Sequence, residues 1–190
     1  MRIFLIGFMG CGKTTLGKKL ARTLNYNFID LDSYIENKTT EKITEIFDKQ
    51  GEQYFRDLEK ESLNEICKMD NMVLASGGGT PCFSDNMQTM LAKGICIYLK
   101  MEAGDLAERL CKEKNNRPLM RHLTENELND FISEKLMERE VCYKKAHHIL
   151  PAKNISTTAI NEIAKSRNIF KIVRKDSFFK KPSDACIAAD

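Results

Sequence analysis

Short apolar runs alternate with helical patterns along most of the chain. Each run is bounded by polar residues or glycine, as is typical of buried strands. Between the runs, apolar residues recur at helical spacing, as Leu16, Leu20 and Leu24 do after the first run. Strands that alternate with helices favour a parallel sheet with helices on both faces. The expected strands are residues 3–6, 28–32, 72–75, 95–99 and 148–150.

The expected helices differ in how clearly they begin and end. The longest helical pattern covers residues 33–69 and is interrupted by Gly51, whereas the pattern at 84–92 stops just before a glycine. Thr124 and Glu127 match a capping box, which predicts the start of another helix. The remaining helical patterns lie at residues 16–24, 105–111, 128–136 and 155–167.

Composition places the chain among ordinary globular proteins. Its 190 residues are 42% apolar and 30% charged, and the formal net charge is +3. These values predict one domain with its own core, and they exclude collagen-like, disordered and disulfide-framework chains. The charge is too small to predict nucleic-acid binding, and no apolar stretch is long enough to predict a membrane span. Seven cysteines without a C-x-x-C pair predict free thiols in a reducing compartment, the cytoplasm.

The most informative motif is the glycine-rich segment Gly7–Thr14, which matches G-x-x-x-x-G-K-[ST]. In such a loop successive backbone N–H groups point at one centre, and the following helix adds its positive end. Lys13 is expected to reach the β- and γ-phosphates, and the Thr14 hydroxyl to bind Mg²⁺. A chance glycine loop is the alternative, but the flanking strand and amphipathic helix stand where the motif requires them. The segment therefore predicts binding of a nucleoside triphosphate.

Polar and glycine residues follow the second and third expected strands. Alternation puts the carboxylates of Asp30 and Asp32 on one side of the second strand, at the end where open α/β sheets bind ligands. One carboxylate can hold Mg²⁺ through water, and the other can orient or deprotonate a hydroxyl. The alternative is that Asp32 only caps the next helix. Gly77–Gly79 predicts close approach of the backbone to a ligand, with a mobile loop as the alternative.

Four arginines are candidates for binding anions. Arg56 can grip a substrate carboxylate while Glu59, on the same helix face, steers it, although the spacing alone favours an exposed ion pair. Arg117 lies in a polar loop and is either solvated or part of a lid that closes on the phosphates. Arg139 lies beside an apolar helix face, where a charge needs an anionic partner. Arg109 can reach the nucleotide base, but by itself it is an ordinary helix arginine.

Taken together, these motifs resemble the shikimate kinase family. The match covers about residues 1–168 and follows the order of the family. The phosphate loop occurs in many kinases, whereas the later elements are more specific and carry the resemblance. The elements are GFMGCGKT at 7–14, FIDLD at 28–32, GEQYFRDLE at 51–59, SGGG at 76–79, NRPL at 116–119 and REVCYKKA at 139–146.

The resemblance implies a three-layer α/β/α P-loop fold of the nucleoside monophosphate kinase type, with a five-stranded parallel sheet. It implies a kinase domain at 1–168, with a substrate-binding helical region at about 33–69 and a lid at about 112–123. Residues 169–190 lie outside the resemblance, show no clear pattern and are expected to form a C-terminal tail. The implied activity is transfer of the ATP γ-phosphate to the 3-hydroxyl of shikimate, with Mg²⁺, in aromatic amino-acid biosynthesis. ATP and shikimate are the expected partners, without nucleic acid or membrane. Kinases of this build are often monomers, which is also expected here.

The resemblance also implies a role for each motif residue. Lys13 and Arg117 act on the transferring phosphate, while Asp32 binds the substrate hydroxyls and serves as the base. Thr14 and Asp30 hold Mg²⁺. Substrate binding is expected of Asp32, Arg56, Glu59, Gly77, Gly78, Gly79 and Arg139. Nucleotide binding is expected of Gly10, Cys11, Gly12, Lys13, Thr14, Thr15, Arg109, Arg117 and Asn154.

Other functions compatible with the phosphate loop stay open at this point. A gluconate kinase or a nucleoside monophosphate kinase shares the build, but Phe55-Arg56-x-x-Glu59 together with the triple glycine argues against both. A GTPase would carry an N-K-x-D motif, which the sequence lacks. A catalytically dead nucleotide-binding module would have lost Lys13, Asp32 or an arginine, and these residues are present.

Overall fold

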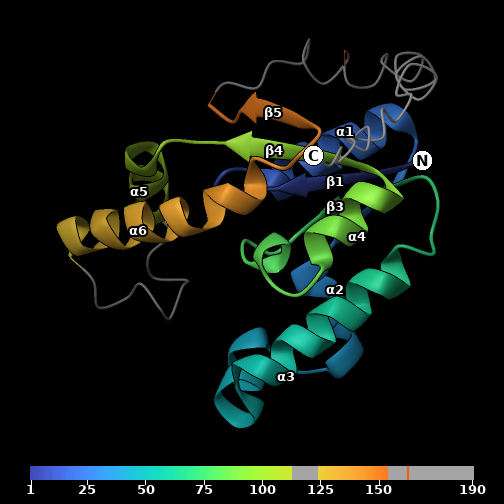
Figure 1. Ribbon diagram of the computed structural model, residues 1–190, viewed down its shortest axis with the longest axis horizontal. Coiled ribbons are helices and arrows are strands. Elements are labelled where there is room, and N and C mark those ends of the chain that lie inside the picture. Colours follow the sequence, from blue (N-terminus) through green and yellow to red (C-terminus); the bar gives the residue numbers. More distant parts are fainter. Residues whose placement is uncertain (113–123, 154–161, 163–190) are drawn as a thin grey trace, which may run out of the picture. The chain divides into compact units, whose positions relative to one another are not determined.

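The computed structural model describes residues 1–112, 124–153 and 162 (Figure 1). The chain divides into two compact units, residues 1–155 and 156–190, and every strand described belongs to the first. Three expected segments lie outside the described residues: the lid apart from Lys112, the last helix apart from Glu162, and the C-terminal tail.

A five-stranded parallel sheet forms the centre of the first unit, with the strand order β2-β3-β1-β4-β5 (Figure 1). β1, β3 and β4 are buried on both faces, and for this reason they appear in the sequence as continuous apolar runs. The expected α/β fold with a parallel sheet is confirmed. The strands are β1 (Arg2–Ile6), β2 (Asn27–Asp30), β3 (Met72–Ala75), β4 (Ile95–Lys100) and β5 (His148–Pro151).

Helices cover both faces of this sheet. The α-helices are α1 (Lys13–Leu24), α2 (Leu31–Thr39), α3 (Ile43–Ile66), α4 (Asn86–Lys93), α5 (Ala103–Lys112) and α6 (Glu125–Tyr143), and a short 3₁₀ helix, η1, covers Thr80–Cys82. On one face α1 approaches so closely that a Cβ at Gly17 would lie 3.3 Å from the Leu5 side chain of β1. Phe4 and Ile6, which flank Leu5 on β1, point to the opposite face of the sheet. There they pack in a buried cluster with residues of α3, α4 and α6. No helix of the described ranges is long and apolar enough to cross a membrane.

The second strand is shorter than its sequence pattern predicts. It ends at Asp30 rather than at position 32, and α2 begins at Leu31. The cause is local, because the Asp30 side chain accepts a hydrogen bond from the Ser33 N–H at 3.4 Å and so caps the helix. Asp32 therefore lies in the first turn of α2 and not on the strand. The residue that caps α2 is Asp30, so the alternative that Asp32 caps this helix is wrong.

The helical region expected at 33–69 is two helices rather than one. Thr40, with φ of 58°, ends α2, and α3 starts at Ile43. The expected interruption at Gly51 is confirmed as a kink, because this residue has φ of 82° and ψ of 173° inside α3. The capping box of Thr124 and Glu127 is also confirmed at the start of α6.

Candidate active site

A cavity of about 470 Å³ opens where the loops after β1 and β3 meet the start of α1 and α2. This edge is formed by the carboxyl ends of parallel strands, where open α/β sheets bind ligands. The structure brings the phosphate loop and both aspartates to this one cavity, as the sequence predicts. The lining residues are Met9, Gly10, Gly12, Lys13, Thr14, Thr15, Asp30, Asp32, Ser76, Gly78 and Arg109.

The phosphate loop has the backbone conformation that its glycines predict. Gly10 and Gly12 have φ of 80° and 97°, values that side-chain-bearing residues rarely adopt, and Gly12 precedes the first turn of α1. The Lys13 ammonium donates to the carbonyls of Gly7 and Phe8 at 2.8 and 2.9 Å. A positive charge is thus held over the loop, beside the N–H groups at the start of α1, which suits a phosphate group.

Thr14 and Asp30 form the part of the cavity that suits a metal ion. The Thr14 hydroxyl donates to Asp30 Oδ2 at 2.8 Å, so two hard oxygen ligands lie side by side at the edge of the phosphate loop. Within the described ranges no cluster of three or more His, Cys, Asp or Glu residues is placed to hold a metal. An ion bound here would take its other ligands from phosphate oxygens and water, which is typical of Mg²⁺ in kinases.

Asp32 faces the same cavity from the first turn of α2. Asp32 is exposed to solvent on the cavity side, and the protein atoms packed around its carboxylate remove part of its hydration. This desolvation, followed by the neighbouring charge of Asp30, raises the pKa of Asp32 from its ordinary value of 3.8 to about 6. The charge of Lys13 acts in the opposite direction. A carboxylate with such a pKa is ionised at neutral pH and basic enough to accept a proton from a hydroxyl.

Arg56 and Glu59 form a buried ion pair on α3, so the exposed pair favoured by their spacing is wrong. Their side chains are 12% and 1% exposed, and Arg56 Nη1 donates to Glu59 Oε2 at 3.0 Å. The guanidinium carbon also lies 3.6 Å from the centre of the Phe83 ring. On its open side the Nε and Nη2 groups donate to Glu52 Oε1 at 3.2 and 2.9 Å. The guanidinium is therefore fixed in the protein with one edge towards solvent.

The glycine loop that follows β3 (Gly77–Gly79) lies against three of the expected site residues. A Cβ on the first glycine would lie 2.9 Å from Asp32 Oδ1, and on the second 3.5 Å from Arg139 Nη1. On the third it would lie 3.1 Å from Arg56 Nη1. The loop backbone is thus approached closely by side chains of the protein, and its predicted approach to a ligand stays a prediction. The loop connects the phosphate cavity with the two arginines.

Arg139 reaches this loop from α6. It is half-buried, and its guanidinium carbon lies 5.6 Å from the centre of the Phe8 ring. Its acidic neighbours on the helix, Glu138 and Glu140, pair with lysines instead. Among the described residues Arg139 has no acidic partner, and the anionic partner expected at its position stays a prediction.

Comparison with known proteins decides between the open alternatives. A family model described as shikimate kinase matches residues 9–171. The chain belongs to the shikimate kinase family. A shikimate kinase from Phocaeicola vulgatus is 46% identical over 151 residues, which are 80% of this chain and 86% of that protein. The expected activity, transfer of phosphate from ATP to shikimate, is thereby confirmed.

Solved structures of shikimate kinases have the same fold. The enzyme from Bacteroides thetaiotaomicron is 38% identical and aligns with a TM-score of 0.80, over 92% of this chain and 98% of its own. The enzyme from Acinetobacter baumannii, solved in complex with shikimate, is 32% identical with a TM-score of 0.72, over 93% of this chain and 94% of its own. The P-loop fold with a five-stranded parallel sheet, which the resemblance implies, is therefore confirmed.

Of the residues expected to bind the nucleotide, one does not line the cavity and two lie outside the described part. The Cys11 side chain is buried and does not line the cavity, and its N–H donates to the Phe8 carbonyl at 3.3 Å. Arg109 does line the cavity, and its Nη1 donates to the Gly10 carbonyl at 3.5 Å. Arg117 and Asn154 lie outside the described residues.

Sequence reasoning missed two residues of this shikimate kinase site that line the cavity, Met9 and Ser76. Both lie inside segments that carry the resemblance, Met9 in GFMGCGKT and Ser76 in SGGG, so membership of these segments was the available signal. The Ser76 hydroxyl lies 3.2 and 3.1 Å from the carbonyl oxygens of Leu5 and Gly77 and can donate its one proton to either of them. Ser76 thus ties the end of β3 to β1 at the cavity floor.

Proposed function

We propose that the glycine loop holds shikimate with Asp32 on one side and Arg56 and Arg139 on the other. The observation that carries this proposal is the contact of all three side chains with that loop. Shikimate is a small acid with one carboxylate and several hydroxyls. Guanidinium groups suit its carboxylate and the carboxylate of Asp32 suits its hydroxyls. The complex of the Acinetobacter baumannii relative with shikimate supports this class of substrate.

The ATP phosphates are proposed to lie in the phosphate loop, beside the 3-hydroxyl of shikimate. Lys13 places its charge near the β- and γ-phosphates, and Arg109 packs on the base. Thr14 and Asp30 would hold Mg²⁺, which neutralises charge on the transferred phosphate when it is bound. Further phosphate and nucleotide contacts are proposed for Gly10, Cys11, Gly12, Thr15, Arg117 and Asn154.

The proposed transfer needs little covalent chemistry from the protein. Asp32 accepts the proton of the 3-hydroxyl as that oxygen bonds to the γ-phosphorus, and the bond from phosphorus to the β-phosphate oxygen breaks, leaving ADP. Lys13 and the N–H groups of the loop stabilise the charge that develops on the phosphate oxygens. Arg117, in the proposed lid at 112–123, would add positive charge to the same oxygens and exclude water.

The remaining proposals concern organisation. We infer a kinase domain at 1–168 with a substrate-binding region at about 33–69 and a tail at 169–190. A monomer is supported because one chain supplies the cavity, Arg56 and Arg139 together. Cytoplasmic location is supported by five cysteines of the described residues that are free thiols, Cys11, Cys67, Cys82, Cys96 and Cys142.

The binding of the carboxylate can be tested with the methyl ester of shikimate, which keeps the hydroxyls and loses the charge. We expect the ester to have a KM higher by about 10- to 100-fold, the range for lost hydrogen bonds to a charged group. Arg139→Ala should raise the KM for shikimate and leave that for the ester nearly unchanged. Equal KM values of acid and ester in the unaltered enzyme would contradict the proposal.

Glu52 is predicted to compete with shikimate for Arg56. Its carboxylate occupies the Nε and Nη2 donors, the edge of the guanidinium that a substrate carboxylate needs. Because Glu52 is 58% exposed, its ion pair is weak, and Glu52→Gln should lower the KM for shikimate by about two- to fivefold. Asp57→Asn is the matched control, since it removes a charge from the same helix at a residue that bonds Gln53 instead. An equal or higher KM in Glu52→Gln would contradict the prediction.

A further inference from the structure

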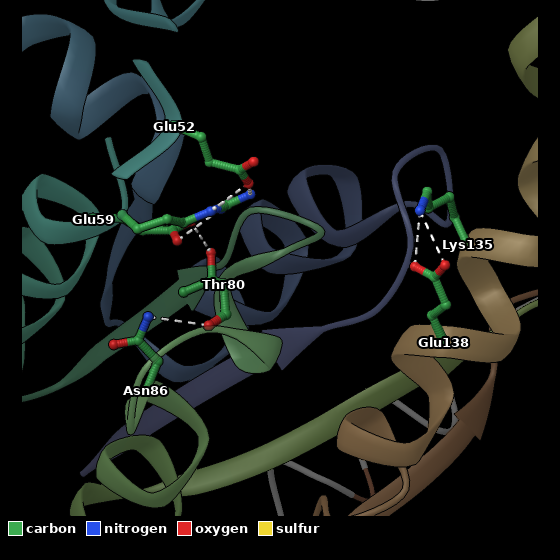
Figure 2. A network of polar contacts seen from close by, with 7 residues as sticks. Glu52, Glu59, Thr80, Asn86, Lys135 and Glu138 are labelled. Atoms are coloured by element: carbon green, nitrogen blue, oxygen red, sulfur yellow. Dashed lines mark hydrogen bonds and ion pairs between the residues drawn. The ribbon is translucent and has the colours of Figure 1, made fainter. Parts of the chain in front are cut away.

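A buried threonine stands directly after the glycine loop and contacts the ion pair on α3. Thr80 is fully buried, and its hydroxyl donates to Glu59 Oε1 at 2.6 Å (Figure 2). This length is that of a charge-assisted O–H···O⁻ bond. The loop makes room for it, because a Cβ at Gly77 would lie 2.9 Å from the Thr80 hydroxyl and 3.2 Å from Glu59 Oε1.

The backbone of Thr80 is itself held by a second buried polar residue. Asn86, at the start of α4, is 1% exposed, and its Nδ2 donates to the Thr80 carbonyl at 3.1 Å (Figure 2). Buried polar groups are costly unless they are bonded, so Asn86 and Thr80 fix one another in place. Because its backbone is held in this way, the Thr80 side chain presents its hydroxyl to Glu59 from a fixed position next to the glycine loop.

The two oxygens of Glu59 have different partners. Oε1 accepts from Thr80 and Oε2 accepts from Arg56 Nη1 at 3.0 Å. The carboxyl torsion of a glutamate is otherwise broad, so a second bond to a fixed donor is what determines where Oε2 points. The orientation of Glu59 in turn decides which edge of the Arg56 guanidinium remains available for a ligand.

We propose that Thr80 and Asn86 are positioning residues for shikimate binding, and that they act through Glu59 on Arg56. The chain runs from Asn86 through the Thr80 carbonyl and hydroxyl to Glu59 and then to the guanidinium. It rests on the proposed function in one respect, the binding of the substrate carboxylate by Arg56. Thr80 and Asn86 touch neither substrate in this arrangement. They contribute by fixing the orientation of the Arg56 guanidinium.

The decisive variant is Thr80→Val, which keeps the shape of the side chain and removes the donor. We expect the KM for shikimate to rise by about tenfold or more, because a bond to a charged and buried partner is lost. The kcat should stay within about threefold and the KM for ATP should not change, as for loss of an interaction made equally in ground and transition state. Thr80→Ser retains the hydroxyl and should restore the KM to nearly that of the unaltered enzyme.

The methyl ester of shikimate separates positioning from general damage to the fold. Thr80→Val should raise the KM of the acid and leave that of the ester nearly unchanged, because the ester has no charge for Arg56 to bind. Equal increases for acid and ester, or a raised KM for ATP, would overturn the proposal. Asn86→Leu, one step further from Arg56, is the second variant and should give the same pattern with a smaller factor, even where Thr80→Val does not fold.

Arg56→Lys separates the proposed binding of the substrate carboxylate by Arg56 from the positioning role of Thr80 and Asn86. It keeps the charge beside Glu59 and loses the planar fork, so the KM for shikimate should rise. An unchanged KM in Arg56→Lys would overturn the role of Arg56 in the proposed function, and the positioning chain with it. A raised KM in Arg56→Lys, with an unchanged KM in Thr80→Val, would overturn the positioning chain alone.

Discussion

Replacing Asp32 with asparagine should lower kcat by about 10²- to 10⁴-fold, the usual contribution of a positioned general base. Asparagine has nearly the same size and can still bind a hydroxyl, but it cannot accept the proton. We therefore expect the KM for shikimate to change by much less than kcat. Initial rates with saturating ATP and varied shikimate measure both constants. A kcat within about threefold of the unaltered enzyme would remove Asp32 from the proposed proton transfer.

The same substitution should not destabilise the protein. Desolvation and the charge of Asp30 raise the pKa of Asp32 in the folded chain from 3.8 to about 6, so the folded state binds more protons than the unfolded state between these values. The free energy of unfolding therefore falls as pH rises through this window, and the loss persists above it. Asp32→Asn removes the unfavourable charge. Its Tm at pH 8 should equal or exceed that of the unaltered protein, while activity is lost.

The pH profile gives a further check on this pair of expectations. In the unaltered enzyme kcat/KM should fall as pH decreases through about 6, where Asp32 becomes protonated. The profile of Asp32→Asn should lack this acid limb and remain low throughout. A limb of unchanged position in the variant would assign the titration to another group.

The fold was predictable because its signals are local and repeated. Buried parallel strands such as β1 and β3 need apolar residues on both faces, so they stand out as short continuous runs. The phosphate loop was predictable for a similar reason, since its glycines and Lys13 are contiguous. Even here the end of β2 was wrong, because the carboxylate of Asp30 caps α2 and stops the strand two residues early. A side-chain cap of this kind competes with strand propensity and is invisible to alternation alone.

The burial of the ion pair on α3 could not be predicted from the residues around it. The spacing of Arg56 and Glu59 is that of any exposed helix pair. Much of what covers them comes from distant positions, such as the ring of Phe83 against the guanidinium and the hydroxyl of Thr80 on the carboxylate. Asn86 gave no signal at all, because a single asparagine near a helix start is ordinary. Such contacts depend on how the chain returns after β3, which no local pattern encodes.

Replacing Lys13 with methionine should also reduce activity strongly. In the structure its ammonium is held by two loop carbonyls at 2.8 and 2.9 Å, so its charge is already placed where the ATP phosphates are proposed to lie. Loss of one preorganised donor to developing charge lowers kcat by about 10²- to 10³-fold, which is the effect that we expect. Lys13→Arg is the matched control, because it keeps the charge in a different shape. Steady-state rates with varied ATP measure the loss.

A second consequence distinguishes Lys13 from a simple phosphate contact. Its positive charge lowers the pKa of Asp32, against the effects of desolvation and of Asp30. Without that charge the pKa of Asp32 should rise further, because no neighbouring cation at this position stabilises the ionised carboxylate. The acid limb of kcat/KM in Lys13→Met should therefore move to higher pH, whereas Lys13→Arg should leave the limb in place. If both variants keep the limb of the unaltered enzyme, the phosphate-binding lysine does not tune the base, and the two ends of the cavity act independently.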